Sequence, residues 1–351
     1  MLKLNKRILF ILAVLSILII IPFSFAEDVG NETLSVDEGI VEIETVGDDI
    51  VYVDDVDDEG DGSADNPYNS VSKAVENYNS SQNSNVYIKN GEYTIDKQID
   101  INKDITLVGE SKEGTILDAK GQNSIFKVSA DSKVTFINLT FKNAKFGSAL
   151  LLSSDKCVVN VDNCNFNNNT DGAIYYKSYF SSSVSLSIVN SSFTNNYNKD
   201  NGGAIYIYGG TLLNITKTVF DNNGAPIGEN DVSKGGAVYC AGNLKNIYIN
   251  YCNFKNNYAI AGSAIAQYCG GNLYISNSIF TNNNAPGNSK YKLNSSVIYN
   301  EQSNPSELIL YLNKNTFESN SINDEVFTKG NVRVSILIKI LKSQPVTLIK
   351  S

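Results

Sequence analysis

The side chains in this sequence that could do acid–base chemistry are four aspartates and one lysine: Asp162, Asp171, Asp221, Asp231 and Lys177. Two carboxyl groups flanking the glycosidic bond are the usual requirement for hydrolysing a polysaccharide. No pair of carboxylates recurs here at a spacing that favours this reaction, and the chain contains no histidine. We therefore interpret the aspartates as turn and surface residues and predict no catalytic residue.

Four tyrosines occupy one recurring position, directly after an aliphatic residue: Tyr175, Tyr206, Tyr239 and Tyr299, with Ala266 interrupting the series. If the aliphatic residue points inward on a strand, the tyrosine points outward. The rings would then stack at strand spacing as an exposed wall that binds sugar rings or a protein. The alternative is that the stacked rings stabilise the structure and bind nothing.

The segment DDVDDEGDG is the one candidate for a metal site. Asp55, Asp57 and Glu59 fall at positions 1, 3 and 5 of a calcium loop, and Gly60 falls at position 6. Position 12 is Asn66 instead of glutamate, so the EF-hand template fails. We interpret the segment as a solvated acidic turn, leave weak calcium binding open, and predict no other cofactor.

The cysteines do not form a recognisable framework. Their number is odd and none are closely paired: Cys157, Cys164, Cys240, Cys252 and Cys269. Buried thiols are the favoured interpretation, and a bridge between Cys240 and Cys269 is left open. The lack of histidine and of clustered cysteines argues against zinc.

The elements that must position these side chains come from an internal repeat. It is marked by Phe141, Phe166, Phe193, Phe220, Phe254, Phe280 and Phe317. The residues seven and five positions earlier are apolar in every copy, which predicts a strand with one buried face. The next inward position is two residues before the phenylalanine, so the alternation slips once. Each copy therefore predicts a strand, a corner and a second strand.

Asparagine follows the phenylalanine at the second and third positions in most copies. Asparagine tolerates the left-handed backbone region, so we expect a second corner with ladders of stacked amides. Segments such as GGAIYI then predict a third short strand. From each phenylalanine to the next such segment the distance varies between 7 and 17 residues, whereas the remainder of the repeat spans only 16 to 20. Insertions confined to one side of a solenoid often mark its binding face.

Three short strands per copy without a helix predict an all-β parallel solenoid over residues 51–340. Ser70 is a good N-cap for a short helix carrying Val71, Ala74, Val75 and Tyr78, which would cover the open end of the core. The alternation from Val332 onward predicts a last strand that covers the end of the core, and residues 341–351 are either a tail or the end of that strand.

The opening segment resembles the N-terminal part of pectate-lyase-like right-handed parallel β-helix proteins. The repeats FNNN (166), FTNN (193), FDNN (220), FKNN (254), FTNN (280) and FESN (317), with GGAI, resemble polymorphic outer-membrane-protein repeats. Those repeats also occur in adhesin-like surface proteins of archaea. FKNA at 141 departs from the pattern, as do GSAL, GSAI and SSVI. The resemblance implies a right-handed parallel β-helix.

Lyases of that fold typically use calcium and a basic residue, usually arginine, and hydrolases use paired aspartates. The only arginines here are Arg7 and Arg333, so none lies on the repeats. The resemblance and the missing residue types favour a non-catalytic protein, with an atypical polysaccharide lyase or hydrolase and a structural envelope component as the alternatives.

The N-terminal 26 residues match a secretory signal peptide. Lys3, Lys6 and Arg7 precede an apolar stretch, and Ser24-Phe25-Ala26 offers a cleavage site. The rival interpretation is an uncleaved anchor, although the apolar stretch is short for a membrane span. Cleavage would leave 25 basic and 37 acidic residues, a net charge of −12, which argues against nucleic acid and anionic membranes as partners.

We therefore expect a secreted or cell-surface, adhesin-like protein that binds extracellular glycans or proteins through its variable loops and tyrosines. Residues 27–50 would form an acidic linker. Of the N-x-S/T sequons, Asn31 and Asn294 lie in expected loops and are the best glycosylation candidates.

Overall fold

The structure, a computed structural model, describes residues 50–57, 60–179, 182–268, 271–302, 308–330, 332–337 and 348–350. All of them belong to one compact unit. The expected signal peptide, the expected linker up to residue 49 and most of the expected tail lie outside these residues. Among the described residues, no helix has the length and apolar character needed to cross a membrane.

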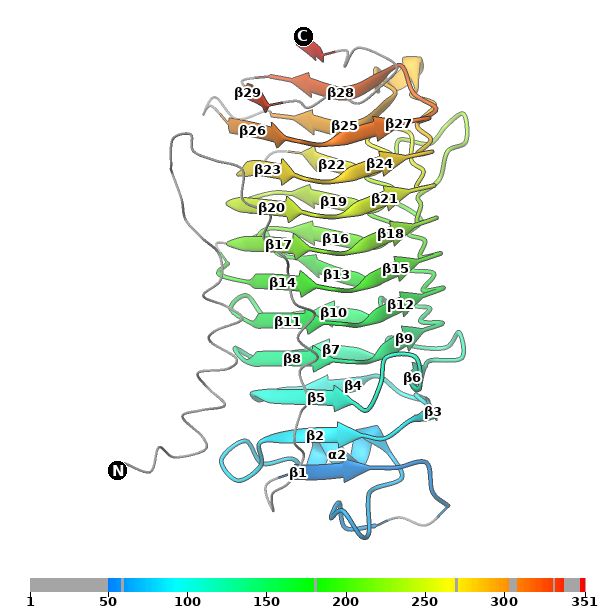
Figure 1. Cartoon of the computed structure of the whole chain (residues 1–351), viewed down its shortest axis with the longest axis vertical. Helices are drawn as coiled ribbons and strands as arrows, with labels where there is room; N and C mark the ends of the chain where they lie inside the picture. The colour runs from blue at the N-terminus through cyan, green and yellow to red at the C-terminus, as the bar shows by residue number, and fades with distance from the viewer. Residues whose placement is uncertain are drawn as a thin grey trace, which may run out of the picture. The chain divides into compact units, whose positions relative to one another are not determined.

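The described chain winds into a stack of coils, and each complete coil contributes one strand to each of three parallel sheets (Figure 1). Sheet A contains β1 (Ile50–Val53), β2 (Asn85–Ile88), β5 (Ile105–Gly109), β8 (Lys133–Ile137), β11 (Val158–Asp162), β14 (Ser185–Val189), β17 (Leu212–Thr216), β20 (Asn246–Asn250), β23 (Asn272–Ser276), β26 (Leu308–Asn313) and β29 (Val332–Leu337). This arrangement confirms the predicted parallel solenoid with three strands per coil.

Sheets B and C complete each coil. Sheet B contains β3 (Gly91–Thr94), β6 (Thr115–Asp118), β9 (Thr140–Lys142), β12 (Asn165–Asn167), β15 (Ser192–Thr194), β18 (Val219–Asp221), β21 (Asn253–Lys255), β24 (Ile279–Thr281) and β27 (Thr316–Glu318). Sheet C contains β4 (Ile99–Ile101), β7 (Phe126–Val128), β10 (Leu150–Leu152), β13 (Ile174–Lys177), β16 (Ile205–Tyr208), β19 (Val238–Ala241), β22 (Ile265–Tyr268), β25 (Ser296–Glu301), β28 (Asp324–Lys329) and β30 (Leu348–Lys350).

The repeating phenylalanines form one column inside the coil. Successive rings from Phe141 to Phe317 lie 4.6–5.0 Å apart between centroids and are stacked nearly parallel, with interplanar angles of 1–10°. They pair in register along sheet B, as Phe193 does with Phe220 and Phe220 with Phe254. Except for Phe317, which is partly buried, they have no exposed surface. Phenylalanine recurs in these seven coils because each ring packs on the ring of the next; in the two coils before them the same position holds Tyr93 and Leu117.

Asparagines form the predicted ladder at the corner after sheet B, and all but the half-buried Asn320 are buried. The members are Asn169, Asn196, Asn223, Asn257, Asn283 and Asn320. Each side-chain amide donates to a phenylalanine carbonyl and, except in Asn320 at the end of the ladder, to the next asparagine, as Asn223 does to the Phe193 carbonyl at 2.9 Å and to Asn257 at 3.0 Å. The ladder satisfies corner groups that would otherwise be buried without partners.

The predicted slip between sheets A and B is a left-handed corner in every coil from Asn138 to Lys314. The residue three positions before each phenylalanine has φ between 50° and 55°. Asparagine occupies four of these positions, but Lys217, Tyr251 and Lys314 occupy the others. A side chain other than glycine or asparagine costs about 1–2 kcal/mol in this conformation.

Tyr251→Gly is therefore expected to stabilise the protein. Tyr251 is 58% exposed, so little packing is lost. Relief of about 1–2 kcal/mol of strain exceeds the roughly 0.5–1 kcal/mol that glycine costs through the unfolded chain. The midpoint of thermal unfolding should rise by roughly 1–3 °C, and Lys217→Gly should behave alike. A lower midpoint for both variants would contradict this account of the corner.

A short helix, α2 (Val71–Asn77), covers the N-terminal end of the stack, as predicted (Figure 1). The Ser70 hydroxyl accepts from the Lys73 amide, and Val71, Ala74 and Val75 are buried. At the other end β29 is the predicted last strand of sheet A, whereas β30 in sheet C was not expected.

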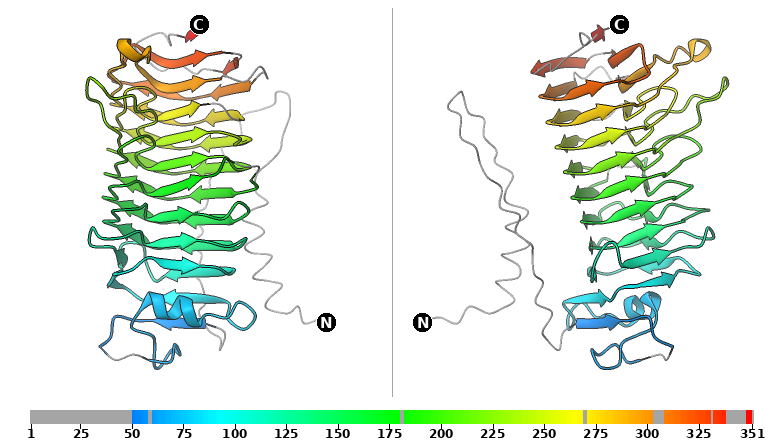
Figure 2. Two further views of the ribbon diagram at one scale, coloured as in Figure 1. Left: turned by 180° about the vertical axis from the view of Figure 1, so that it is seen from behind. Right: turned by 45° about the vertical axis from the view of Figure 1, so that its right-hand side comes forward.

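The loops that lead into sheet C are the variable part of the coil. The longest belong to the C-terminal half of the stack, and Figure 2 shows them, coloured yellow-green to gold, projecting from one side. One contains the short 3-10 helix η1 (Ser289–Tyr291). These loops stand beside the outer face of sheet C, where the candidate site lies.

Candidate ligand-binding groove

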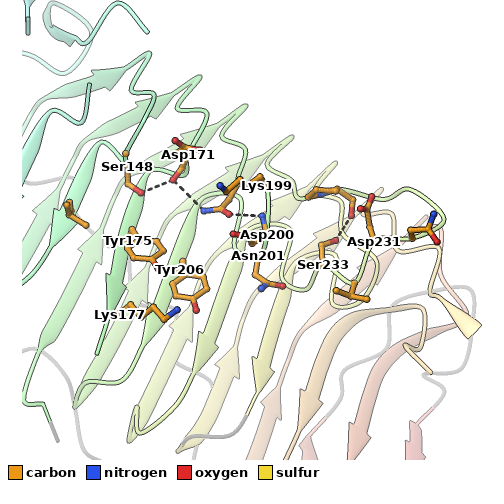
Figure 3. A pocket seen from close by; sticks show the side chains of 16 residues that line it. Ser148, Asp171, Tyr175, Lys177, Lys199, Asp200, Asn201, Tyr206, Asp231 and Ser233 are labelled. Atoms are coloured by element: carbon orange, nitrogen blue, oxygen red, sulfur yellow. Dashed lines mark hydrogen bonds between the residues drawn. The ribbon is translucent and has the colours of Figure 1, made fainter. Parts of the chain in front are cut away.

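A pocket of about 670 Å³ opens between the outer face of sheet C and the loops that precede its strands (Figure 3). Tyr175 and Lys177 of β13 and Tyr206 of β16 form part of its floor. Asp171, Asp200 and Asp231 line it from the loops before β13, β16 and β19. Three successive coils thus contribute one carboxylate each.

The tyrosines of the floor stack as predicted, but their facing sides cover each other. The Tyr175 and Tyr206 rings lie 4.7 Å apart between centroids with an interplanar angle of 11°, and Tyr206 is 5.2 Å from Tyr239. Burial raises the pKa of Tyr175 and raises that of Tyr206 to about 12. Their hydroxyls therefore stay protonated at neutral pH, and the two half-buried side chains offer ring edges and hydroxyls to a ligand.

The prediction that Tyr239 and Tyr299 are exposed is wrong. Tyr239 is 8% exposed and Tyr299 only 1%. Both belong to a second apolar cluster on the outer face of sheet C, which includes Ala266 and contacts Leu293 of a variable loop. The loop folds over the outward row of residues, so Tyr299 is structural, whereas the remaining surface of Tyr239 lines a second recess.

A second recess of about 330 Å³ adjoins the pocket, because Asn201 and Val232 line both. We call the pocket and the recess together the groove. In the recess the Lys234 ammonium lies 4.6 Å from the Tyr268 ring centroid and 3.4 Å from Glu301.

Glu301 ties Tyr299 into this cluster. The carboxylate also pairs with Lys329 at 2.6 Å and accepts the Tyr299 hydroxyl at 2.8 Å. Although burial opposes ionisation, these partners hold the pKa of Glu301 below its usual value. The bond to Glu301 is a further reason to assign Tyr299 a structural role.

The structure brings together some of the acid–base candidates and separates others. Asp171, Asp231 and Lys177 share the pocket. Asp162 lies on β11 in sheet A, and Asp221 lies on β18 in sheet B, where it pairs with Lys255 at 3.0 Å. These two are corner and surface residues, as interpreted from the sequence.

Lys177 is held as a cation. A hydrogen bond with Tyr179 and the neighbouring phenols Tyr206 and Tyr175 raise the pKa of Lys177 despite some desolvation. A raised pKa disfavours the neutral amine, so Lys177 is poorly suited to act as a general base and well suited to bind an oxygen of a ligand.

Sequence reasoning missed Asn198 and Asp200, which shape the loop wall. The Asn198 amide donates to the Asp171 carbonyl at 3.4 Å, the Ser148 hydroxyl donates to the same carbonyl at 2.8 Å, and the Asp200 amide donates to the Asn198 side chain at 2.9 Å (Figure 3). The only signal available was the longer insertion after Phe193.

Loop 225–236, which forms the far wall, is fastened by a loop of the later coil. The Asn288 side-chain amide donates to the carbonyls of Glu229 and Asp231 at 2.9 and 3.0 Å. Lys290 donates to Asn230 at 3.0 Å. Asp231 in turn accepts from the Gly228 amide at 2.5 Å. The wall therefore keeps a defined conformation beside the strand floor.

Asp55, Asp57 and Asn294 are not among the residues that line the groove. Asp55 and Asp57 are exposed, Glu59 lies outside the described residues, and no cluster of three or more metal-ligating side chains occurs in the described part of the chain. Asn294 is half-buried in the loop before β25, and Asn31 is outside the described residues. The calcium and glycosylation predictions stay predictions.

Four cysteines are buried free thiols, as the favoured interpretation expects: Cys157, Cys164, Cys240 and Cys252. Burial raises the pKa of each, to about 11 for Cys157 and about 12 for Cys164 and Cys252, which makes the thiols unreactive. Cys269 is not among the described residues.

Comparison with solved structures finds pectin methylesterases at low identity. The enzyme from carrot is 15% identical over 87% of this chain and 90% of that chain, with a TM-score of 0.46. PemA from Erwinia chrysanthemi is 14% identical over 71% and 80%, with a TM-score of 0.41. The Aspergillus niger enzyme is 13% identical over 79% and 86%, with a TM-score of 0.38. None of these likenesses bears on activity.

No curated protein sequence matches the chain. Residues 123–307 match the family described as right handed beta helix region, which agrees with the parallel sheets and stacked coils. The match spans 185 of the 351 residues and includes most of the groove. The chain therefore belongs to the right-handed β-helix family.

Proposed function

We propose that this protein is an exported, non-catalytic surface protein that binds glycans in the groove. The observation that carries the proposal is the convergence of phenol, carboxylate, amide and ammonium groups on one open pocket. Sugar hydroxyls both donate and accept hydrogen bonds, so a mixed set of this kind suits them better than a surface of one charge. Strands provide a rigid floor and variable loops provide the wall, which is how binding sites are commonly built.

Two features of the sequence support the location and class of partner. The N-terminal 26 residues have the pattern of a signal peptide, and the repeats resemble those of adhesin-like surface proteins. The acidic chain, with net charge −9 before any cleavage, favours an uncharged or weakly charged partner over nucleic acid.

Tyr206→Phe is expected to weaken glycan binding by roughly 5–10-fold, because it removes one hydroxyl worth about 1 kcal/mol and leaves the stacked ring. Asp171→Asn should also weaken binding, because it removes a charged acceptor from the pocket. A glycan array would identify a ligand, and titration calorimetry would measure the change.

Tyr248→Phe is the matched control for Tyr206→Phe. Tyr248 also stacks on a tyrosine of the next coil, Tyr274 at 4.9 Å, but it lies on β20 in sheet A, away from the groove. Unchanged binding is expected. If the wild-type protein binds no glycan on the array, the proposed function is wrong. Equal losses of glycan affinity in Tyr248→Phe and Tyr206→Phe would show that the groove is not the binding site.

Polysaccharide cleavage is a second candidate, favoured by the presence of Asp171, Asp231 and Lys177 in one pocket. The cationic state of Lys177 speaks against it as the base of a lyase. Incubation with neutral and acidic polysaccharides, with and without calcium, tests the idea directly. If the wild-type protein forms new reducing ends or unsaturated products and Asp171→Asn does not, the function is polysaccharide cleavage and not binding alone.

A further inference from the structure

Phe146 is the most exposed large apolar side chain among the residues described, at 77%. It lies in the loop between β9 and β10, and the next residue, Gly147, lines the pocket. The Lys145 ammonium stands 5.2 Å from the Phe146 ring centroid. The high exposure of the ring leaves most of its apolar surface open to solvent, one residue along the chain from the pocket lining.

The backbone of Phe146 is strained as well. Its φ is 61°, in the left-handed region that a phenylalanine seldom adopts. Burial of the side chain in the core could offset this strain, but the Phe146 side chain is largely exposed. A bulky residue held in a strained backbone conformation beside a pocket is a reason to consider a functional role for it.

The floor of the pocket lacks what Phe146 offers. The facing sides of Tyr175 and Tyr206 cover each other at 4.7 Å, so these residues present edges and hydroxyls. A pyranose ring has an apolar side of C–H bonds in addition to its hydroxyl groups. An exposed aromatic ring beside a polar floor can pack on that side while the floor binds the hydroxyls.

We propose that Phe146 is a ligand contact of the groove and stacks on the C–H side of a pyranose unit of the glycan. This inference rests on the proposed function and makes it more specific. The ligand is then a pyranose glycan with one accessible C–H side, and the loop between β9 and β10 is part of the binding site.

The test uses two glycine substitutions that relieve the same backbone strain. Phe146→Gly should weaken binding of an array-identified oligosaccharide by 5–10-fold or more, while the midpoint of thermal unfolding rises by a few degrees. Tyr251→Gly, at φ 52° in an exposed corner between sheets A and B, should raise the midpoint by a similar amount and leave binding unchanged. Phe146→Trp, which keeps an aromatic plane, should retain binding.

The opposite signs of stability and binding in Phe146→Gly are the result expected only for a contact residue. Wild-type binding together with unaltered affinity in Phe146→Gly would overturn the inference and leave the proposed function standing. Loss of binding in both glycine variants would also overturn it, because the effect would then follow from the backbone. Absence of any binding by the wild-type protein would reject the proposed function and this inference together.

Discussion

Asn223→Leu is expected to lower the free energy of unfolding by about 3–5 kcal/mol, because buried polar groups lose their partners. The Asn223 side chain makes four hydrogen bonds of 2.9–3.1 Å. Two of these bonds join Asn223 to the side chains of Asn196 and Asn257. The other two join it to the backbone carbonyl of Phe193 and the backbone N–H of Asn196. Leucine fills a similar volume, so the loss reports hydrogen bonding and not a cavity. Urea or thermal unfolding followed by circular dichroism would measure it.

Asn214→Ala provides the control in the same coil. Asn214 lies on the outer face of β17, is half-buried, and donates to the Ser187 hydroxyl at 3.3 Å. Its removal should change stability by at most about 0.5 kcal/mol. If Asn223→Leu is no more costly than Asn214→Ala, the ladder does not carry the corner and the explanation of the repeated asparagines is wrong.

Phe220→Ala is expected to cost about 3–5 kcal/mol through the cavity that it leaves in the column. Phe220 has no exposed surface, and its ring stacks on Phe193 at 4.9 Å and on Phe254 at 4.7 Å. Both neighbours would lose a packed face. Phe220→Leu should cost less, because it retains most of the apolar contact. Equilibrium unfolding of the two variants gives the comparison.

Phe146→Ala is the matched control for Phe220→Ala, because it truncates a phenylalanine that is exposed. Because Phe146 is largely in solvent, its truncation should leave stability within about 0.5 kcal/mol of wild type. A small loss for Phe220→Ala would mean that the column tolerates voids, and the strict recurrence of phenylalanine would need another cause.

The sequence predicted the coil because stacking imposes the same requirement on every copy. Phe193, Phe220 and Phe254 must occupy equivalent places or the column breaks, and Asn196 must meet Asn223 for the corner to be satisfied. Such requirements appear as a spacing that can be counted. The slip between the first two strands was visible for the same reason, although Tyr251 and Lys217 show that the corner tolerates unfavoured residues.

The groove was harder to predict because it depends on loops that do not repeat. Tyr206 and Tyr299 have the same place in their coils, yet one lines the pocket and the other is buried. Their difference comes from the loop containing Leu293 and from Glu301, neither of which is part of the repeat. In the same way, Asp171 and Asp231 meet in one pocket across 60 residues of sequence because their coils are two apart. A spacing rule for adjacent residues cannot reveal this.

The asparagine ladder has a consequence for how such a protein changes its length. Asn196 and Asn223 are neighbours in the ladder and are 27 residues apart, so the segment between them is one full coil. Duplicating this segment within the gene would insert one more coil, whose contacts with the coils on either side match those already present. The solenoid can therefore lengthen or shorten by whole coils without new kinds of contact between coils. Each added coil can also acquire its own variable loop on the same side of the stack.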